Sequence, residues 1–289
     1  MMDELIQLFT YQFIINALWA VLFTSFMAGI VGTYVVTRRM VFVGGGITHA
    51  SFGGIGIAYY FGLPPFAGAA FFAILSALGI EWLNVKGKIR EDSAIAIIWS
   101  FGMAIGILFM FLSPGYTPNL MGFLFGDILT VKTTDLYWLA ALSGLLTLLM
   151  ILFHRPVMYV AFDPDFAGIS GWPVKTIRLA VIALVATAIV LAIKVTGIIL
   201  VLSLFTVPQA IANIKIKKFI PMMVYSVIIS MVISMAGLFA AYFLDLPTGA
   251  VIIFLLTSVY IVVKASLWIG GWIRKSGVKR ANATLGSSK

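Results

Sequence analysis

The sequence predicts an all-α membrane protein, a polytopic bundle of eight or nine transmembrane helices. Hydrophobic residues make up 62% of the 289 residues and charged residues only 10%, whereas an average soluble domain is about 25% charged. A soluble protein of this length would need more charge to cover its surface, so lipid must solvate much of the chain. The strands of a β-barrel would be about ten residues long and would alternate in hydrophobicity, and the hydrophobic runs of this chain do neither.

Nine hydrophobic runs divide the chain, and charge, proline or glycine bounds each of them. One span needs about 20 apolar residues, and the runs are 12–37, 41–62, 65–83, 94–113, 136–153, 179–196, 198–213, 220–243 and 248–268. Little beyond Gly197 separates the sixth run from the seventh, so the count is eight or nine. If it is eight, one run is re-entrant or lies in the interface. We expect residues 1–273 to form a single transmembrane domain and 274–289 to be a disordered, polar cytoplasmic tail.

The distribution of positive charge predicts an orientation. Basic residues collect in the cytoplasmic loops of membrane proteins, which explains the net charge of +9 better than a nucleic-acid partner does. If nine runs alternate and the carboxyl terminus is cytoplasmic, all of the 19 Lys and Arg residues except Lys132 and Lys194 lie inside. The loop 154–178 is then cytoplasmic. The loop 114–135 is outside, where its apolar stretch fits a short re-entrant or interfacial helix.

His49 is the first candidate for chemistry within the membrane. It lies in the middle of the second run, in GGGITHASFGG, between Thr48 and Ser51. A polar group at this depth is costly and deserves a functional hypothesis, and imidazole is a ligand for zinc, iron and other transition metals. A simple hydrogen bond between helices is the competing interpretation.

Glycine and proline mark places where helices approach closely or bend. The G-x-x-x-G motif at 102–106 and the glycines at 53–56 favour close helix packing in lipid. Three successive glycines at 44–46 weaken a helix and permit either a kink or the close approach of another segment. After Pro208, Gln209 and Asn213 share a helix face and are expected to line a cavity or to form a hydrogen bond across helices.

No active site is apparent in the sequence, and we expect neither catalytic residues nor a resident cofactor. The chain has no Cys, which excludes disulfides and thiolate metal sites. It has no G-x-x-x-x-G-K-[ST] motif, so ATP is expected to bind on a separate chain. No Ser/His/Asp set or pair of carboxylates converges within the membrane runs.

Four segments, in this order along the chain, resemble the permease family of zinc and manganese ABC importers. They are TRRMVFVGGGITHASFGGIGIAYYFG, FLFGDIL, AFDPDFAGISG and VTGIILVLSLFTVPQAIA. The resemblance runs from about residue 12 to 268. Each motif alone is loose, but four in order, with the matching charge distribution, are specific.

The resemblance implies a type II ABC importer-like permease in a bacterial or archaeal cytoplasmic membrane. A homodimer of such permeases surrounds one pathway, and separate cytoplasmic ATPase subunits drive it. An extracytoplasmic metal-binding protein delivers a divalent metal ion. The segment expected to couple the chain to the ATPase contains Phe162, Asp163, Ala167 and Gly171.

The resemblance also implies a metal-binding pair within the second run. The family's Asp and His correspond to positions 45 and 49, which share a helix face because they are four residues apart. Position 45 is Gly in this chain. The remaining ligands are then His49, Thr48, backbone carbonyls or His49 of a second copy. Asp127 is a candidate at the mouth of the pathway, and a helix cap explains it equally well.

The predicted function is that of the membrane subunit of an ATP-driven importer of zinc, manganese or iron ions. The alternative is a secondary transporter or channel that works alone, but this would need charged residues at mid-membrane for ion coupling, and the chain has few. A membrane enzyme is a third class, disfavoured because no catalytic set is present.

Overall fold

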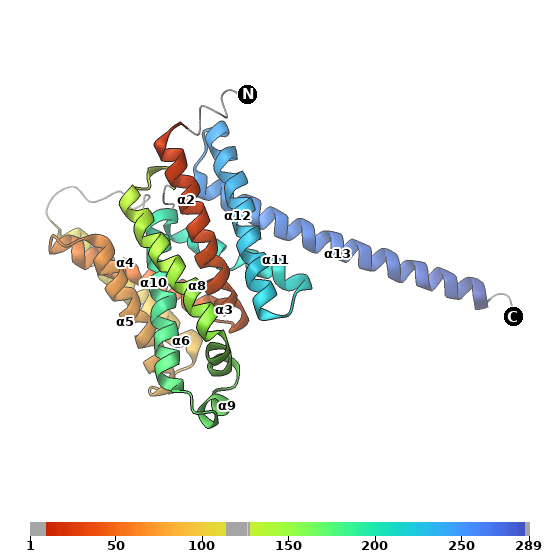
Figure 1. The fold of residues 1–289 in the computed structure, drawn as a ribbon, viewed down its shortest axis with the longest axis horizontal. Helices are drawn as coiled ribbons and strands as arrows, with labels where there is room; N and C mark the ends of the chain where they lie inside the picture. Colours follow the sequence, from red (N-terminus) through yellow and green to blue (C-terminus); the bar gives the residue numbers. More distant parts are fainter. Residues whose placement is uncertain (1–9, 114–125, 127, 287–289) are drawn as a thin grey trace.

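The computed structural model describes residues 10–113, 126 and 128–286, with side chains described as far as residue 269. All regular structure in these ranges is helical, which confirms the predicted fold class (Figure 1). The elements are α2 (Gln12–Met27), η1 (Ala28–Gly32), α3 (Thr33–Thr37), α4 (Val41–Tyr60), α5 (Pro65–Val85), α6 (Glu91–Leu112), η2 (Ile128–Thr130), α8 (Thr133–Phe162), α9 (Pro164–Ile169), α10 (Val174–Leu204), α11 (Val207–Lys215), α12 (Phe219–Leu244) and α13 (Thr248–Gly286).

Eight segments in the described part of the chain are long and apolar enough to cross a membrane. The first combines α2, η1 and α3, and the sixth, Val174–Lys215, contains two of the predicted runs. Within that segment Gly197 has φ 78° and ψ 165°, so the helix is broken there. Figure 1 shows α10 rising from α9 and α12 rising again beside α2. The chain must therefore turn back near Gly197 and descend through 198–215, as the predicted boundary between two runs requires.

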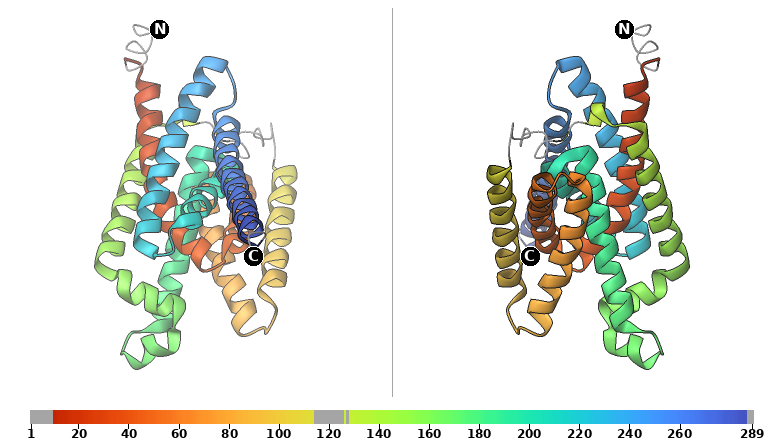
Figure 2. Two further views of the ribbon diagram at one scale, coloured as in Figure 1. Left: turned by 90° about the vertical axis from the view of Figure 1, so that its right-hand side faces the viewer. Right: turned by 90° about the vertical axis from the view of Figure 1, so that its left-hand side faces the viewer.

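Helix α10 lies between two apolar cores and joins them. One core is formed mainly by α2, α8 and α10, and Leu238 of α12 and Ile252 of α13 complete it. The other is formed by α4, α5 and α6. Val185 and Ile189 of α10 belong to the first core, whereas Ala186 and Val190 belong to the second. Two faces of one helix are thus buried on opposite sides, so α10 connects the two halves of the bundle (Figure 2).

Helix α4 packs against α6 through glycine, as the sequence predicts. A Cβ atom at Gly53 would lie 2.7 Å from the carbonyl oxygen of Gly102, and one at Gly102 would lie 2.6 Å from Cα of Ala50. Any larger residue at these positions would force the two backbones apart. The glycines at 44–46 lie within the regular helix α4, so they form no kink. At Gly46 the alternative expectation, a close approach, is met, because Ile95 lies against the backbone.

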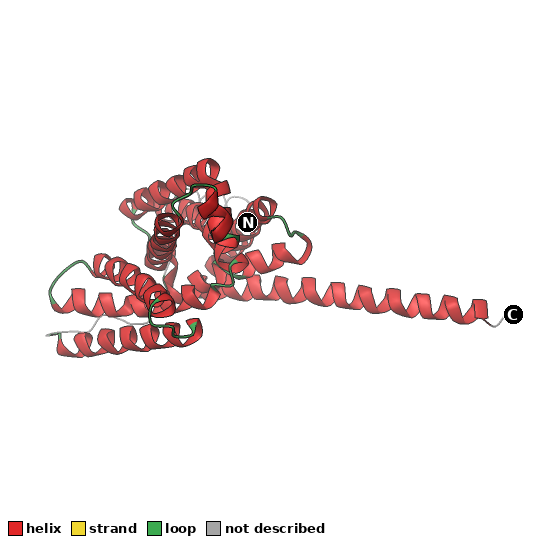
Figure 3. Cartoon of the chain, turned by 90° about the horizontal axis from the view of Figure 1, so that it is seen from below, coloured by secondary structure: helices red, strands yellow, loops and turns green. Residues whose placement is uncertain are grey.

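The chain ends and loops divide between two ends of the bundle. The end of α3, the α5–α6 loop, helix α9 and the α11–α12 loop lie toward the lower end in Figure 1, and α2 begins at the upper end. This division agrees with the predicted alternation of loops. Helix α13 projects from the bundle (Figure 3) and remains helical to Gly286, where we expected a disordered tail from 274.

Candidate functional site

Gly45, Thr48 and His49 lie on α4 in the interior of the bundle. Gly45 and Thr48 are buried and His49 is half-buried. The Thr48 hydroxyl donates a hydrogen bond of 2.7 Å to the carbonyl oxygen of Gly44. This bond uses the hydroxyl hydrogen but leaves the oxygen free to accept or to bind a cation.

The imidazole of His49 stacks on the indole of Trp99, a residue of α6. The ring centroids are 4.3 Å apart and the ring planes differ by 5°. No hydrogen bond to either imidazole nitrogen occurs among the described residues, so the competing expectation of a hydrogen bond between helices is not met. The stack instead holds the ring in a fixed orientation, and both nitrogens remain available at its edge.

Within the described residues, the side chains of one copy do not form a complete metal site. No group of three or more His, Cys, Asp or Glu residues occurs there, and α4 contains no carboxylate. A Cβ atom at Gly45 would lie 3.7 Å from Leu202, an ordinary contact, so the helix has room for a side chain at the position where the family pattern has Asp. Asp127, the candidate for the mouth of the pathway, lies outside the described residues.

The broken helix faces this part of α4. Leu202, which approaches Gly45, belongs to the portion that follows Gly197. Broken helices in transporters commonly lie beside the substrate pathway, because their unwound backbone is shielded there by protein. Of the predicted pathway residues, Gly45 therefore lies between α4 and the broken helix, whereas the His49 ring lies against α6.

Gln209 ties the returning portion to the first span. It is fully buried, and its side-chain Nε2 donates a hydrogen bond of 2.6 Å to the carbonyl oxygen of Ala28. Ala28 is the first residue of η1, a π-helix, and π-helical turns are frequent at functional sites. A Cβ atom at Gly32 would lie 2.7 Å from Cδ of Gln209. The expectation of a hydrogen bond across helices at Gln209 is therefore confirmed.

The predicted coupling segment forms a short helix, α9, with a defined cap at each end. The Asp163 carboxylate accepts a hydrogen bond of 3.0 Å from the backbone N–H of Phe166, and Pro164 occupies the first helical turn. Ala167 is fully buried. Gly171, with φ 81°, ends the segment in the left-handed region that favours glycine. These roles explain why the pattern requires these residue types.

Two apolar side chains of α9 were missed by the sequence reasoning. Ile169 is 89% exposed and Phe166 is 48% exposed. Phe166 also meets Tyr159 edge to face, with 5.2 Å between the ring centroids. A contiguous exposed apolar patch marks a surface for a partner, and these two side chains make α9 the candidate for such a surface. A signal was present in the sequence, because Phe166 and Ile169 are three residues apart and would share one face of a helix formed there.

The coupling segment contacts the chain that leads into α4. The guanidinium carbon of Arg38, which precedes α4, lies 6.0 Å from the ring centroid of Phe162, at the outer limit of a cation–π interaction. Phe162 ends α8 immediately before α9. The residue just before α9 thus lies against the segment that leads into the helix containing His49.

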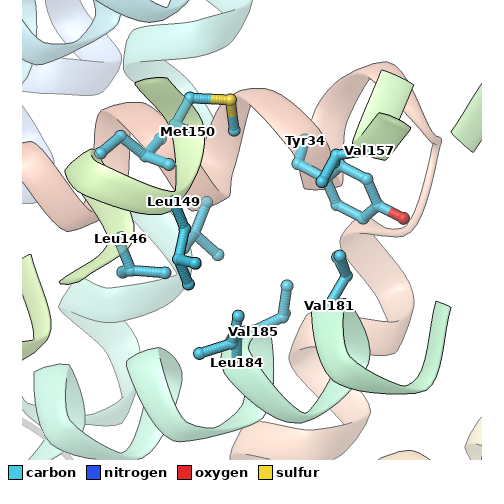
Figure 4. Close-up of a pocket in the computed structure, with 10 residues that line it drawn as sticks. Tyr34, Leu146, Leu149, Met150, Val157, Val181, Leu184 and Val185 are labelled. Carbon is cyan, nitrogen blue, oxygen red and sulfur yellow. The ribbon is translucent and has the colours of Figure 1, made fainter. Parts of the chain in front are cut away.

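Helix α8 is bent above the coupling segment. The predicted run ended at 153, but the helix continues to Phe162 with a non-helical residue, Phe153 (φ −120°, ψ 17°). Pro156 has no N–H to donate to the carbonyl four residues earlier, which explains the bend. A cavity of about 60 Å³ lies beside it. Figure 4 shows Tyr34 from α3, Met150 and Val157 from α8, and residues of α10 around this space.

Comparisons with known proteins agree with this architecture. A model of the ABC 3 transport family matches residues 10–266. A probable metal transport system membrane protein of Chlamydia trachomatis is 38% identical over 242 residues, 82% of this chain and 83% of that protein. The manganese transport system membrane protein MntC of Halalkalibacterium halodurans is 30% identical over 254 residues, 88% and 87% of the two chains.

A solved structure has the same fold along almost the whole chain. PsaBC from Streptococcus pneumoniae, determined in complex with Fab, superposes with a TM-score of 0.80 and 28% sequence identity, covering 91% of this chain and 95% of that one. The family model extends over the helices that position His49, the broken helix and α9, and the relatives and the solved structure each match 82–91% of this chain. The chain therefore belongs to the ABC 3 transport family.

Proposed function

We propose that this chain is the membrane subunit of an ATP-driven importer of divalent transition metal ions, working as two copies with separate ATPase subunits. The main support is that Phe162, the last residue of α8 and two residues before α9, lies against Arg38 in the segment that precedes α4. A partner that pushes on α9 would move the helix that contains His49. The names of the relatives from Chlamydia and Halalkalibacterium, which refer to metal and manganese transport, support metal as the cargo.

The proposed mechanism is alternating access. ATP binding closes the ATPase pair, which displaces α9, and the bend in α8 beside the apolar cavity accommodates the displacement. The metal ion passes between α4 and the broken helix. His49 supplies an imidazole ligand there, and Thr48 and backbone carbonyls supply oxygen. The orientation follows the positive-inside rule, with α9 and the carboxyl terminus in the cytoplasm and the delivery protein on the other side.

Transport by the whole complex tests the proposal. The chain and its ATPase are reconstituted in proteoliposomes, and uptake of Zn²⁺, Mn²⁺ and Fe²⁺ is followed with a chelating dye inside. We expect uptake only with ATP. His49→Ala should reduce it by at least about tenfold, the scale on which metal sites respond to lost interactions. His154→Ala is the matched control, because it removes the chain's other histidine, at the lower end of α8. ATP-independent uptake by the chain alone would instead identify a stand-alone transporter.

Gly45→Asp tests the position of the metal within the pathway. The substitution adds a carboxylate four residues before His49, at a position with room for a Cβ atom. We expect the metal to bind at least about tenfold more tightly, while Gly45→Asn, of equal size and without charge, should have little effect. If the two variants behave alike with all three metals, the ion does not pass this face of α4.

The docking role of α9 is tested by Ile169→Glu. A charge placed on this apolar surface should abolish co-purification with the ATPase and the ATP dependence of uptake. Ser170→Glu is the control, since it introduces the same charge at the next residue, at the end of α9. Normal complex formation by Ile169→Glu would place the docking surface elsewhere.

A further inference from the structure

The lower end of the bundle contains an open pocket between the end of α5 and the start of α10. Its volume is about 600 Å³. Leu78 and Trp82 of α5 and Leu179 of α10 form its apolar walls. Trp82 is 59% exposed, at the level where tryptophan is enriched in membrane proteins, the boundary between hydrocarbon and water.

Positive charge exceeds negative charge around this pocket. Glu81, Lys86, Lys175 and Arg178 line it. Arg178 forms an ion pair of 2.7 Å with Glu81, which neutralises the single carboxylate. Lys86 and Lys175 form no ion pair with any described residue. Two ammonium groups therefore remain beside an apolar wall.

A second pocket along the same two helices provides a comparison for the excess positive charge of the lower pocket. It lies toward the upper end, between α5, α8 and α10, and has a similar volume of about 570 Å³. Its single charged lining residue is Lys194, which forms an ion pair of 2.5 Å with Asp135. The upper pocket is thus apolar and electrically neutral, whereas the lower pocket is apolar with two uncompensated cations.

We propose that the lower pocket binds an anionic phospholipid of the surrounding membrane. The phosphate lies between Lys86 and Lys175, and the first part of an acyl chain lies along Leu78, Trp82 and Leu179. Basic pockets between membrane-spanning helices are suited to anionic headgroups. The combination of a cationic rim and an apolar wall matches a ligand that has both a phosphate and a hydrocarbon chain.

A lipid fits this surface better than the ATPase does. The exposed apolar residues that suit a protein partner, Phe166 and Ile169, belong to α9 rather than to the pocket. The pocket instead lies between two spans, with apolar walls that water would solvate poorly. A soluble partner would have to reach across the headgroup region to fill it. Lipid binding here does not depend on which ion the protein transports.

Lipid binding by the purified full chain tests the proposal. The protein is placed in nanodiscs of phosphatidylcholine containing a small fraction of phosphatidylglycerol, and retained lipid is counted by native mass spectrometry after transfer to detergent. We expect one phosphatidylglycerol per chain to be retained. Lys86→Gln with Lys175→Gln should weaken its binding on the order of thirtyfold, since each lysine near an anionic surface contributes about a factor of five.

Matched variants and competitors distinguish a specific lipid site from general attraction to basic residues. Lys217→Gln with Lys218→Gln removes two exposed lysines at the same end and should leave retention unchanged. Soluble glycerol phosphate at millimolar concentration should not displace the lipid. Equal loss in both pairs of variants, equal retention of phosphatidylcholine, or displacement by glycerol phosphate would overturn the proposal. The proposal would also be overturned if a second copy or the ATPase released the lipid on binding and could be crosslinked to Lys175, because a protein would then occupy the pocket.

Discussion

Helix α4 and the broken segment Val174–Lys215 are the two most buried spans in the described part of the chain, and their burial is achieved differently. In their most hydrophobic stretches, 78% and 72% of the residues are buried. Helix α4 is continuous and packs its backbone against α6 through glycine. The other segment is interrupted at Gly197, and a buried side chain, Gln209, attaches its second part to the first span.

The difference indicates which parts move. Backbone contacts between glycine faces have few rotatable groups, so α4, α5 and α6 are expected to move as one body. A left-handed glycine within a span is a place where a few dihedral angles absorb a large displacement. The boundary between the rigid unit and the hinged one thus runs where Gly45 of α4 meets Leu202 of the broken segment.

The largest expected effect comes from Gly53→Ala on the rigid side. The new methyl group would lie 2.7 Å from the carbonyl oxygen of Gly102, so the helices must separate, at a cost of about 3 kcal/mol of unfolding free energy. Gly44→Ala is the matched control on the same helix, because its added Cβ atom would lie 3.7 Å from Cδ1 of Ile189, an ordinary contact. It should stabilise the protein by up to about 1 kcal/mol through helix propensity. Unfolding in mixed detergent micelles with increasing SDS measures both, and equal effects would disprove backbone packing.

Gly197→Ala tests the hinge and should have the second largest effect. The dihedral angles φ 78° and ψ 165° belong to a region that is nearly exclusive to glycine, so an alanine there costs about 2 kcal/mol. Metal uptake should fall together with stability. Gly144→Ala is the control, because nothing lies within 4 Å of its added Cβ atom. If Gly197→Ala retains both stability and uptake, the break is not a hinge.

The sequence predicted the spans well, because length and hydropathy are local properties. The described structure has eight candidate spans, within the predicted eight or nine, and it contains the break at Gly197 and the close approach at 102–106. The family was also predicted correctly from four short segments. Asp163, Ala167 and Gly171 cap or anchor the short helix α9, and their role in coupling to an ATPase stays a prediction.

What the sequence could not predict depends on neighbours distant in the chain. Trp99 lies on α6 and His49 on α4, with α5 between them in the chain. Only the packing of α4 against α6 brings the two rings together. The lower end of α8 was missed because hydropathy falls at His154, although the backbone continues as a bent helix. Lys194 of α10 pairs with Asp135 of α8, 59 residues earlier in the chain. Contacts between residues on different helices depend on how the helices pack, and hydropathy along the sequence does not predict that packing.

Gln209→Met gives the smallest of the three effects and shows how firmly the hinged part is attached. Methionine has a similar volume but cannot donate to the carbonyl oxygen of Ala28, and a buried hydrogen bond contributes about 1 kcal/mol. The Oε1 atom of Gln209 has no partner among the described residues. Its removal offsets part of that cost, so we expect a net loss of about 1 kcal/mol or less.

The functional consequence of Gln209→Met should exceed this small loss of stability. With the attachment to η1 weakened, the part after Gly197 is freer to move, and ATP hydrolysis should continue with less metal transported per ATP. Asn213→Leu is the control, one turn further along α11, where the side chain contacts Lys217 rather than another span. An unchanged ratio of metal to ATP in Gln209→Met, alongside the expected loss of stability, would mean that Gln209 only holds the fold together. The hinge would then act without this attachment.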